Sequence, residues 1–597
     1  MCAGLTALLA AIATPAKATT SLGVTTSASP ISVDFDETTG RMTVTVKPAG
    51  SYQGATWSQG IATTGNQTWT NGTIVTNPAP TDTSLTATAT INGIPSVSVI
   101  LELDTTAGAG DLVVTLRNPS ANLAGTPNKV INYPHPFYTS TTPATTGYAI
   151  VPINSGYVVP TSDTTFAPLA PVLSRHMEFI GGSDANNDGA WIGIIESHAD
   201  ATLALEQATV NSASHIGLTP SWLGSNENAA HTKELLSYDR VIRYHFFPTG
   251  GYVAVTKRFR EYADSKGWLK TLAEKSIDNP AVLDLIGAPI IYLWGDGHDT
   301  AFPGILKAKG ITKALLQLST NHLDQFNKFP NNDFPDTSNW FTTTVHDQGF
   351  RGRFYDIYES TGSGTGYGGK VYLWPPAATS GAWATVKEDM TKSGSYDICA
   401  AEQAVFASGT RLPAHVNRFH MDAAFFDVLI TKNGVECYDD VNGHFETRAD
   451  DLDSRAAVLN AAYSYFDPAN PSNPPLLTGA EQARDWAVPY QVWGEGVQHL
   501  GKYDSQGTVS FPTVTGGWNG NTYPDVVTDM KVLTTGSNSQ LASLLSEGYQ
   551  VPLWDLVFHD CLLATLHWER AQNKFLYVWD HEDLAAMIRG QTVLFKL

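Results

Sequence analysis

The sequence predicts two domains, a β-rich domain followed by an α/β domain. Residues 20 to 250 are rich in Thr, Ser, Gly and Val in short alternating runs, the pattern of antiparallel strands with one buried face. After residue 285, apolar strands, polar loops and helices follow one another, which is typical of β/α units. The length of 597 residues suits two or more domains. We therefore expect a multidomain fold that passes from a β-sandwich to a β/α barrel.

The composition excludes several classes of function. The chain carries 36 Lys and Arg against 57 Asp and Glu, a net charge of -21, and no basic run that could neutralise a phosphate backbone. We therefore expect no nucleic-acid partner. The four Cys show neither metal-ligand spacing nor a disulfide framework. The 15 Trp, 23 Tyr and 24 Phe suit packed cores, and their faces also suit the apolar faces of sugar rings.

Residues 1–19 form a signal-like segment. Its apolar stretch at 4–18 ends in a small-x-small sequence, as a secretory signal does before cleavage, although it lacks a basic start. We expect an exported protein, secreted, periplasmic or held at the cell surface. No later segment reaches the roughly eighteen apolar residues of a membrane span, so no membrane span is predicted.

The β-sandwich domain is predicted at residues 20–255. Turn residues fall often between its strands, which indicates antiparallel sheets rather than a parallel sheet. The clearest alternating runs lie at 41–48, 84–93, 96–104 and 111–119.

One turn of this domain has the start of a calcium-binding loop. Asp184, Asn186 and Asp188 place oxygen ligands on alternate residues, and Gly189 permits a sharp turn. The bidentate acid of such a loop is displaced by one residue, to Glu196. Because the flanking runs predict a β-hairpin, an ordinary Asn, Asp and Gly turn is the plainer interpretation, and a structural calcium ion is the alternative.

A helical linker at 256–286 leads into the barrel domain at 287–597. Phe259, Tyr262 and Ala263 share one helical face. The predicted barrel strands lie at 287–295, 313–319, 352–360, 415–426, 489–496 and 551–560. Helices are predicted between them at 303–310, 383–392, 454–466 and 538–547.

The strand count falls short of a complete barrel. Six strong strands are predicted, and a β/α barrel has eight. Weaker runs at 575–580 and 591–597 could complete the count. Without them we expect a barrel that is incomplete at its C-terminus.

Acids, His and aromatic residues recur at the ends of the predicted strands. The C-terminal ends of barrel strands form the catalytic face, so these side chains should converge. One buried acid is usually structural, but acids at five strand ends favour a site. The residues concerned are Asp296, His298, Asp299, Tyr355, Asp356, Tyr358, Glu359, His420, Asp422, Trp493, Glu495, His559 and Asp560.

Several carboxylates beside aromatic residues favour glycoside hydrolysis. One carboxylate attacks or stabilises an oxocarbenium-like centre, and another carboxylic acid protonates the leaving oxygen. The sequence has no G-x-S-x-G elbow, H-E-x-x-H zinc motif or Walker A loop that would indicate other chemistry.

Four features in order resemble one family. They are the bridge "FREYADSKGWLKTLAEK" with "NPAVLDLIGAP", the Asp422 strand, the later "GEG" and "VPLWDLVFHD". Together these resemble the endo-α-N-acetylgalactosaminidase-like glycoside hydrolases. The resemblance implies a mutarotase-like β-supersandwich before a distorted (β/α)8 barrel. It also implies retention of configuration and α-linked galactose-type or N-acetylgalactosamine-type substrates.

The resemblance also implies roles for residues. Asp422 matches the nucleophile at the end of strand four, and Glu495 matches the general acid/base on a following strand. Asp296, together with His298 or Asp299, matches the polar cluster around the sugar of the −1 subsite. The other strand-end residues expected to bind substrate are Tyr355, His420, Trp493 and His559.

Some assignments stay open at this point. His420 could pack in the core instead of binding substrate. Asp427 lies five residues beyond Asp422 and would face the other way on one strand, which favours a structural ion pair for it. Glu436 and Glu446 follow in a loop that could reach the cleft.

The predicted partner is an oligosaccharide, polysaccharide or glycoconjugate substrate, and no cofactor is required. Two alternatives remain, a non-catalytic carbohydrate-binding or envelope protein on a barrel scaffold, and an inverting glycosidase. Carboxyl groups about 5 Å apart would indicate retention, and a separation of about 6.5 to 9.5 Å would indicate inversion.

Overall fold

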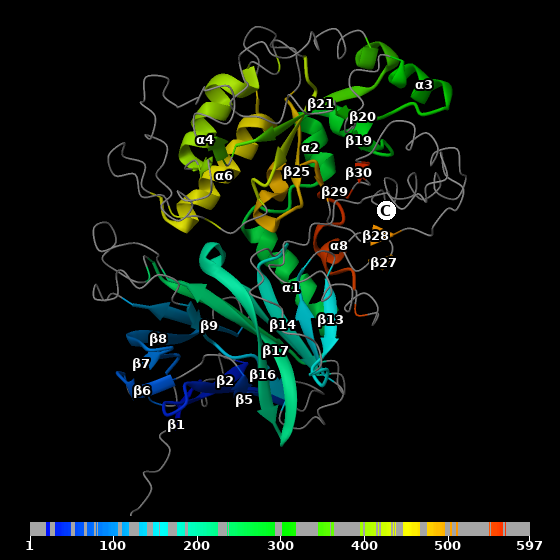
Figure 1. Cartoon of the computed structure of the whole chain (residues 1–597). Helices are drawn as coiled ribbons and strands as arrows, with labels where there is room; N and C mark the ends of the chain where they lie inside the picture. Colours follow the sequence, from blue (N-terminus) through cyan, green and yellow to red (C-terminus); the bar gives the residue numbers. More distant parts are fainter. Residues whose placement is uncertain are drawn as a thin grey trace, which may run out of the picture.

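The computed structural model describes a β-rich domain and a barrel domain, with the linker helix α1 (Gly251–Ser265) between them (Figure 1). The described residues are 19–23, 30–48, 54–64, 69–76, 79, 82–104, 110–118, 130–139, 147–153, 156–164, 176–184, 189–224, 236, 238–292, 301–317, 344–358, 360–362, 395–397, 400–413, 416, 420–430, 434, 436, 446–465, 475–495, 502–503, 509–510, 549, 551–564 and 567–568. No helix within these ranges is long and apolar enough to cross a membrane.

Antiparallel sheets build the β-rich domain, as the alternating runs predict. A five-stranded sheet has the order β1 (Thr19–Leu22), β2 (Ile31–Asp36), β3 (Arg41–Val46), β4 (Ala55–Gln59) and β11 (Phe137–Thr139). A four-stranded sheet has the order β10 (Val130–Asn132), β17 (Ala213–Leu223), β16 (Ala201–Val210) and β5 (Ile61–Thr64).

The third sheet of this domain has nine strands. Its order is β13 (Tyr157–Pro160), β12 (Tyr148–Val151), β14 (Phe179–Asp184), β15 (Gly189–Ile195), β18 (Arg240–Phe247), β9 (Asp111–Arg117), β8 (Ile94–Asp104), β7 (Ser84–Ile91) and β6 (Trp69–Ile74). Alternate residues of β2, β3 and β7 are buried, because successive side chains of a strand point to opposite faces.

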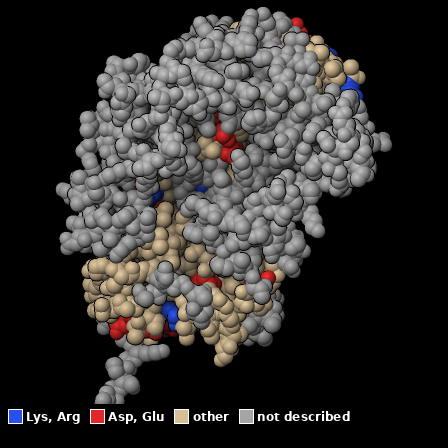
Figure 2. All heavy atoms as spheres, in the orientation of Figure 1, with Lys and Arg blue, Asp and Glu red and all other residues tan. Residues whose placement is uncertain are grey.

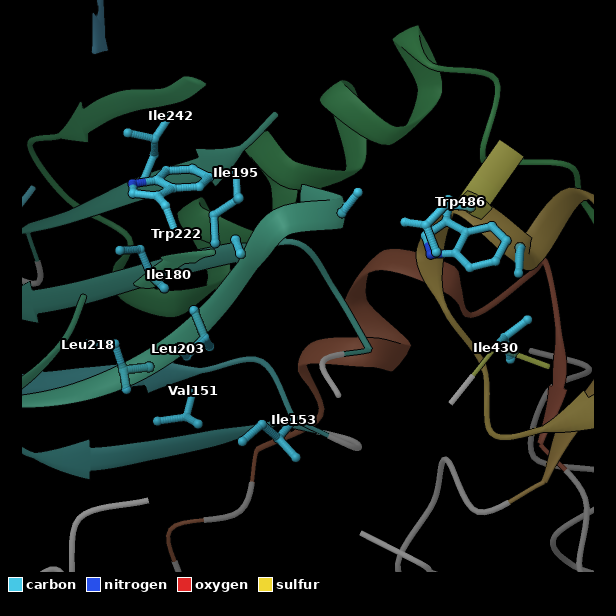
Figure 3. Packing of buried hydrophobic residues seen from close by; sticks show 14 of the residues in the cluster. Val151, Ile153, Ile180, Ile195, Leu203, Leu218, Trp222, Ile242, Ile430 and Trp486 are labelled. Carbon is cyan, nitrogen blue, oxygen red and sulfur yellow. The ribbon is translucent and has the colours of Figure 1, made fainter. Parts of the chain in front are cut away.

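A single buried cluster joins the two domains. Figure 3 shows Val151, Ile180, Leu203, Trp222 and other core residues packed between strands of the β-rich domain. The same cluster includes Ile430 and Trp486 of the barrel domain. Separating the domains would therefore expose apolar surface.

The linker helix α1 buries the predicted face. Phe259, Tyr262 and Ala263 are buried on it, together with Val255. The next helix, α2 (Leu272–Asp278), begins with a capping box, and the turn η4 (Pro280–Leu285) follows.

Eight parallel strands form the sheet of the barrel domain. In spatial order they are β29 (Leu563–Ala564), β26 (Trp493–Glu495), β25 (Leu477–Glu481), β24 (Ala423–Asp427), β21 (Arg351–Ile357), β20 (Leu315–Gln317), β19 (Ile290–Tyr292) and β30 (His567–Trp568). β29 pairs with β26 and β30 pairs with β19. Because β29 and β30 are only two residues apart in the chain, this segment joins the two edges of the sheet.

The strand predictions for this domain need three corrections. Residues 553–558 form the helix α8 (Leu553–Phe558), not part of a strand at 551–560. The predicted strand at 415–426 begins only at Ala423. The strand β25 was not predicted, because its sequence LTGAE is short and contains Gly. The runs at 575–580 and 591–597 lie outside the described residues.

Helices cover the outside of the sheet. Predicted helices at 303–310 and 454–466 correspond to α3 (Phe302–Ala308) and α6 (Arg448–Tyr463), and α4 (Ala400–Phe406) packs against α6. The predicted helices at 383–392 and 538–547 lie outside the described residues.

Lys275 of α2 closes the amino-terminal end of the sheet. Its ammonium group is fully buried and donates to the carbonyls of Val488, Gln491 and Cys561 at 2.7, 2.6 and 2.6 Å. Gln491 precedes β26 and Cys561 precedes β29, so the Lys275 side chain ties α2 to the starts of two strands.

Candidate active site

Three acidic residues lie at the carboxyl edge of the parallel sheet. β24 ends at Asp427, β25 at Glu481 and β26 at Glu495. Phe426 pairs with Ala480, so the register places Asp427 beside Glu481 on the next strand. Glu481 in turn pairs with Glu495. The three residues therefore stand side by side on consecutive strands.

The strand faces show which side of the sheet is the barrel interior. One face contributes a buried cluster from six strands, which with the linker residues contains Ile290, Leu315, Ala423, Phe425, Leu477, Trp493 and Leu563. The other face packs with the surrounding helices, through Ile291, Leu316, Phe354, Ala424, Phe426 and Ala480. Asp427 follows Phe425 by two residues and Glu481 follows Leu477 by four, so both share the interior face.

The two acids are linked through the backbone that follows Asp427. The amide of Val428 donates to Oε2 of Glu481 at 3.2 Å. Glu481 is only 2% exposed, while Asp427 is partly exposed. Figure 2 shows Asp and Glu atoms reaching the surface within the barrel half of the molecule.

The residues immediately after both acids have left-handed backbone. Val428 has a φ of 51° and Gln482 a φ of 66°. Such φ values are unfavourable for residues other than Gly, especially for a β-branched Val, and they occur preferentially at functional sites. Both strands therefore leave the sheet through strained residues next to a carboxylate.

The interior below this edge is filled by an aromatic and cationic layer. The Arg353 guanidinium lies 4.6 Å from the Phe425 ring centroid and 5.9 Å from that of Trp493. A Cβ at Gly479 would come within 2.0 Å of the Trp493 ring, so only Gly allows this packing. Trp493 is fully buried, which makes it a core residue and does not support its predicted contact with substrate.

Asp422 lies at the opposite edge of the sheet, which corrects the prediction that it ends strand four. The strand begins one residue after it, at Ala423. Its carboxylate accepts hydrogen bonds from His346 Nε2 at 2.7 Å, Arg351 at 3.0 Å and the Gly352 amide at 2.7 Å. These contacts describe a structural ion pair at the amino edge. Asp422 therefore precedes β24, and Asp427 is the acid at the carboxyl end of that strand.

The structure separates other predicted site residues from the three acids. His420 is exposed and precedes β24, at the amino edge with Asp422. His559 is exposed after α8, where its Nδ1 is 3.2 Å from the Asp555 carbonyl. The backbone of Tyr355 pairs with Phe425, on the interior register, and its side chain is not described.

The remaining predictions fall partly outside the described residues. Asp296, His298, Asp299, Asn186 and Asp188 lie there, and Asp184 is described only as the last residue of β14. The calcium loop is therefore untested. Within the described ranges no group of three or more His, Cys, Asp or Glu is arranged to hold a metal ion.

The two acids predicted in a loop that could reach the cleft, Glu436 and Glu446, have structural contacts. Glu436 is buried and pairs with Arg448 at 3.3 Å. Glu446 is buried and accepts hydrogen bonds from Ser454 Oγ at 2.5 Å and from the Ala401 amide at 3.3 Å. Glu481, which the sequence reasoning missed, has the position at the edge that they lack. The sequence feature that could have identified Glu481 is an acid at the end of a short apolar run.

The β-rich domain holds the segment that follows Glu481. Arg484 NH1 lies 3.3 Å from Glu178 Oε1, and the Glu178 amide donates to Asp485 at 2.8 Å. The Asp485 amide donates to the carbonyl of His176. Burial, together with the charge of Glu178, raises the pKa of Asp485 well above its ordinary value. A buried charged cluster thus fixes the loop beside the acidic edge.

Known proteins share this architecture. Residues 372–597 match the model of glycosyl hydrolases related to the GH101 family, GH129. No curated protein sequence matches the chain significantly.

Solved structures of NagBb, an α-N-acetylgalactosaminidase from Bifidobacterium bifidum, resemble most of the chain. The ligand-free form gives a TM-score of 0.65 at 17% identity, over 95% of this chain and 92% of that chain. Its Gal-NHAc-DNJ complex gives 0.61 at 19% identity, over 90% and 82%. At this identity the likeness establishes the fold. With the family match, it confirms the predicted resemblance to endo-α-N-acetylgalactosaminidase-like enzymes and identifies the protein as a glycoside hydrolase.

Proposed function

We propose that the protein is a retaining glycoside hydrolase of α-linked N-acetylgalactosamine-type or galactose-type sugars, with Asp427 as nucleophile and Glu481 as general acid/base. The observation that carries this proposal is the placement of Asp427 and Glu481 side by side on adjacent strands. Neighbouring strands lie about 4.8 Å apart, which suits the roughly 5 to 5.5 Å between the carboxyl groups of retaining enzymes.

The order of the strands assigns the two roles. β24 is the fourth strand of the parallel sheet along the chain, and the resemblance assigns the nucleophile to the end of strand four. Asp427, not Asp422, occupies that end. The acid/base belongs to a following strand, and Glu481 ends the next one. The strained backbone after each acid supports functional roles for both.

The reaction then has two steps. A carboxylate oxygen of Asp427 attacks the anomeric carbon while the Glu481 carboxylic acid gives its proton to the departing glycosidic oxygen. Water then attacks the anomeric carbon of the glycosyl ester while Glu481 takes a proton from that water, so the bond to Asp427 breaks, the sugar is released, and Asp427 is again a carboxylate and Glu481 a carboxylic acid. The substrate class is taken from the name of the structurally similar enzyme NagBb and from the related family.

A second candidate is an inverting enzyme that uses Asp427 with Glu495. Glu495 ends the strand two places from that of Asp427, and two strand spacings amount to about 9.6 Å, just past the upper end of the inverting range of about 9.5 Å. The initial product distinguishes the two mechanisms. Proton NMR during hydrolysis of an aryl α-N-acetylgalactosaminide should first show the α-anomer, and an initial β-anomer would refute retention.

Leaving-group dependence tests Glu481 directly. Glu481→Ala should strongly slow cleavage of natural glycosides, because these need protonation, while activated aryl glycosides still form the glycosyl-enzyme. Azide should then yield an α-glycosyl azide by attacking without base assistance. The matched variant Glu495→Ala should give no azide product. If only Glu495→Ala shows rescue, Glu495 is the general acid/base, as the family resemblance implies, and Glu481 is not.

A separate panel tests the sugar. Aryl α- and β-glycosides of galactose, N-acetylgalactosamine, glucose and arabinose are incubated with the enzyme, and phenol release is measured. Release from α-N-acetylgalactosaminide or α-galactoside alone supports the proposal. Release only from β-linked or glucose-type substrates would refute the substrate class.

A further inference from the structure

The segment that follows Glu481 leaves the barrel sheet and packs on the β-rich domain. Ala483 is fully buried in an apolar cluster that also contains Ile150 and Phe179 of the β-rich domain and Val255 of the linker helix α1. The chain therefore passes from the candidate general acid/base into the interface between the two domains within two residues.

Polar contacts hold the next two residues to the segment just before β14. Arg484 Nη1 donates to Glu178 Oε1 at 3.3 Å, and these two side chains are 1% and 0% exposed. The Asp485 carboxylate accepts the amides of Glu178 and Trp486, each at 2.8 Å, and the Asp485 amide donates to the His176 carbonyl at 3.0 Å. A charge removed from water is stable only beside an opposite charge, so the Glu178 carboxylate fixes the position of Arg484.

The turn between Glu481 and this anchor has strained backbone. Gln482 has a φ of 66°, a conformation that persists only where the surrounding structure holds it. The hydrogen bonds on either side are long, since Gln491 Nε2 donates to the Gln482 carbonyl and the Val428 amide to Glu481 Oε2, both at 3.2 Å. Arg484 is the first charged residue after Glu481 in the chain. Release of Arg484 would let the turn relax, and the Glu481 carboxyl group would move with it.

We propose that Glu178 is a positioning residue for the general acid/base. Through Arg484, the β-rich domain holds Glu481 where its proton can reach the departing glycosidic oxygen, although Glu178 itself does not touch the substrate. This inference rests on the proposed role of Glu481. It gives the β-rich domain a part in the reaction rather than in packing alone.

Loss of the Glu178 side chain should affect one class of substrate more than another. A displacement of a reacting group by about 1 Å can slow a reaction about 10²-fold. Protonation of the leaving oxygen matters most when the leaving group is poor, and a good leaving group departs without it. A misplaced Glu481 should therefore slow the cleavage of glycosides with poor leaving groups and spare activated ones.

A second ion pair between the two domains provides a matched control. Asp200 of the β-rich domain lies 3.2 Å from Arg448 of the barrel domain, and these side chains are 1% and 5% exposed. Arg448 begins the outer helix α6, whereas Arg484 follows Glu481 by three residues. Breaking either pair should weaken the contact between the domains, but only the Glu178 pair is connected to the candidate acid/base.

The test compares Glu178→Ala with Asp200→Ala in the full chain. The substrates are aryl α-glycosides of the sugar that the enzyme cleaves, with leaving groups from dinitrophenol to unsubstituted phenol, and kcat/KM is measured for each. In Glu178→Ala, kcat/KM should fall about 30-fold or more for the phenyl glycoside and less than about threefold for the dinitrophenyl glycoside. In Asp200→Ala, both values should change by the same factor.

A milder pair, Glu178→Gln and Asp200→Asn, keeps the side-chain shapes and decides the matter if either Ala variant fails to fold. Glu178→Gln should show the same dependence on the leaving group to a smaller extent. An equal loss for all leaving groups in the Glu178 variants, or the same selective loss in the Asp200 variants, overturns the proposal.

The variant Glu481→Ala separates this inference from the function on which it rests. If Glu481→Ala slows poor leaving groups selectively and the Glu178 variants do not, only the positioning role is refuted. If Glu481→Ala itself shows no such selectivity, the acid/base role of Glu481 is refuted, and the positioning role of Glu178 with it.

Discussion

Replacing Asp422 and Asp427 separately with Asn should have different effects: Asp422→Asn should lower stability, and Asp427→Asn should lower activity. Asp427→Asn removes the oxygen charge that forms the glycosyl-enzyme while keeping the side-chain shape. We expect hydrolysis to fall by ~10³-fold or more, with folding nearly unchanged. Asp422→Asn should leave the turnover rate of the folded enzyme within about threefold of the original, because this residue lies at the far edge of the sheet.

The stability cost of Asp422→Asn follows from its contacts. Its carboxylate accepts three hydrogen bonds, two of them from the side chains of His346 and Arg351. The amide of Asn has one acceptor oxygen and turns an NH2 group toward donors, so at least one charged contact is lost, worth about 1.5 to 3 kcal/mol. The Asp422 side chain is 15% exposed and Arg351 keeps Asp284 as a partner, so we expect about 2 kcal/mol.

Two measurements on the same protein preparations test both effects. Urea unfolding followed by Trp fluorescence gives the midpoint, and release of nitrophenol from an aryl α-N-acetylgalactosaminide gives the rate. A folded Asp422→Asn protein without activity, together with an active Asp427→Asn protein, would refute the placement of the catalytic edge. Equal loss of activity in both would show that Asp422 acts on the site through the strand.

Three further predictions concern stability. Lys275→Met leaves the buried carbonyls of Gln491 and Cys561 without a donor among the described residues and removes one of two donors from the Val488 carbonyl, so it should cost about 3 kcal/mol or more in urea unfolding. Lys270→Met, which breaks a partly exposed ion pair with Asp278 and a cation–π contact with Tyr463, should cost only about 1 kcal/mol. Gly479→Ala drives a Cβ into the Trp493 ring and should lower the unfolding midpoint by about 1 to 3 kcal/mol, so an unchanged midpoint would contradict the packing. Asp111 accepts hydrogen bonds from His245 and Arg258. Burial raises the pKa of Asp111, but these two partners outweigh burial and hold that pKa below its ordinary value of 3.8. The Asp111 carboxylate therefore stabilises the folded protein above pH 3.8, and this stabilisation is lost as the pH falls through the lower pKa of the folded state. At pH 7 the unfolding free energy of Asp111→Asn should be about 2 kcal/mol below that of the unmodified protein, and this difference should disappear in strong acid.

Local patterns predicted those elements whose burial alternates along the chain. The run at 84–93 contains β7, where every second residue is buried, and the helical face of Phe259, Tyr262 and Ala263 is buried in α1. In both cases the side chains of one short segment face a single core. Periodicity reports this directly.

The site depended on strand ends, which periodicity does not report. In "FHMDAAFFDVLI" an Asp precedes the strand and another ends it, and all four residues between them are buried. Both faces of a barrel strand are covered, so no alternation marks its bounds. Only the register with β21 and β25 shows that Asp427 belongs to the carboxyl edge.

The joining of the sheet edges by the segment 563–568 has a consequence for folding. β19 begins at Ile290, and its partner β30 begins at His567, so this contact spans 277 residues of chain. During synthesis β19 and β26 remain open edges, able to pair with other chains, until β29 and β30 emerge from the ribosome. Closing a loop of this length makes completion of the sheet a late and slow step in folding. Chaperones should therefore assist folding, and chains truncated after β26 should aggregate, because the edges of their sheet stay open.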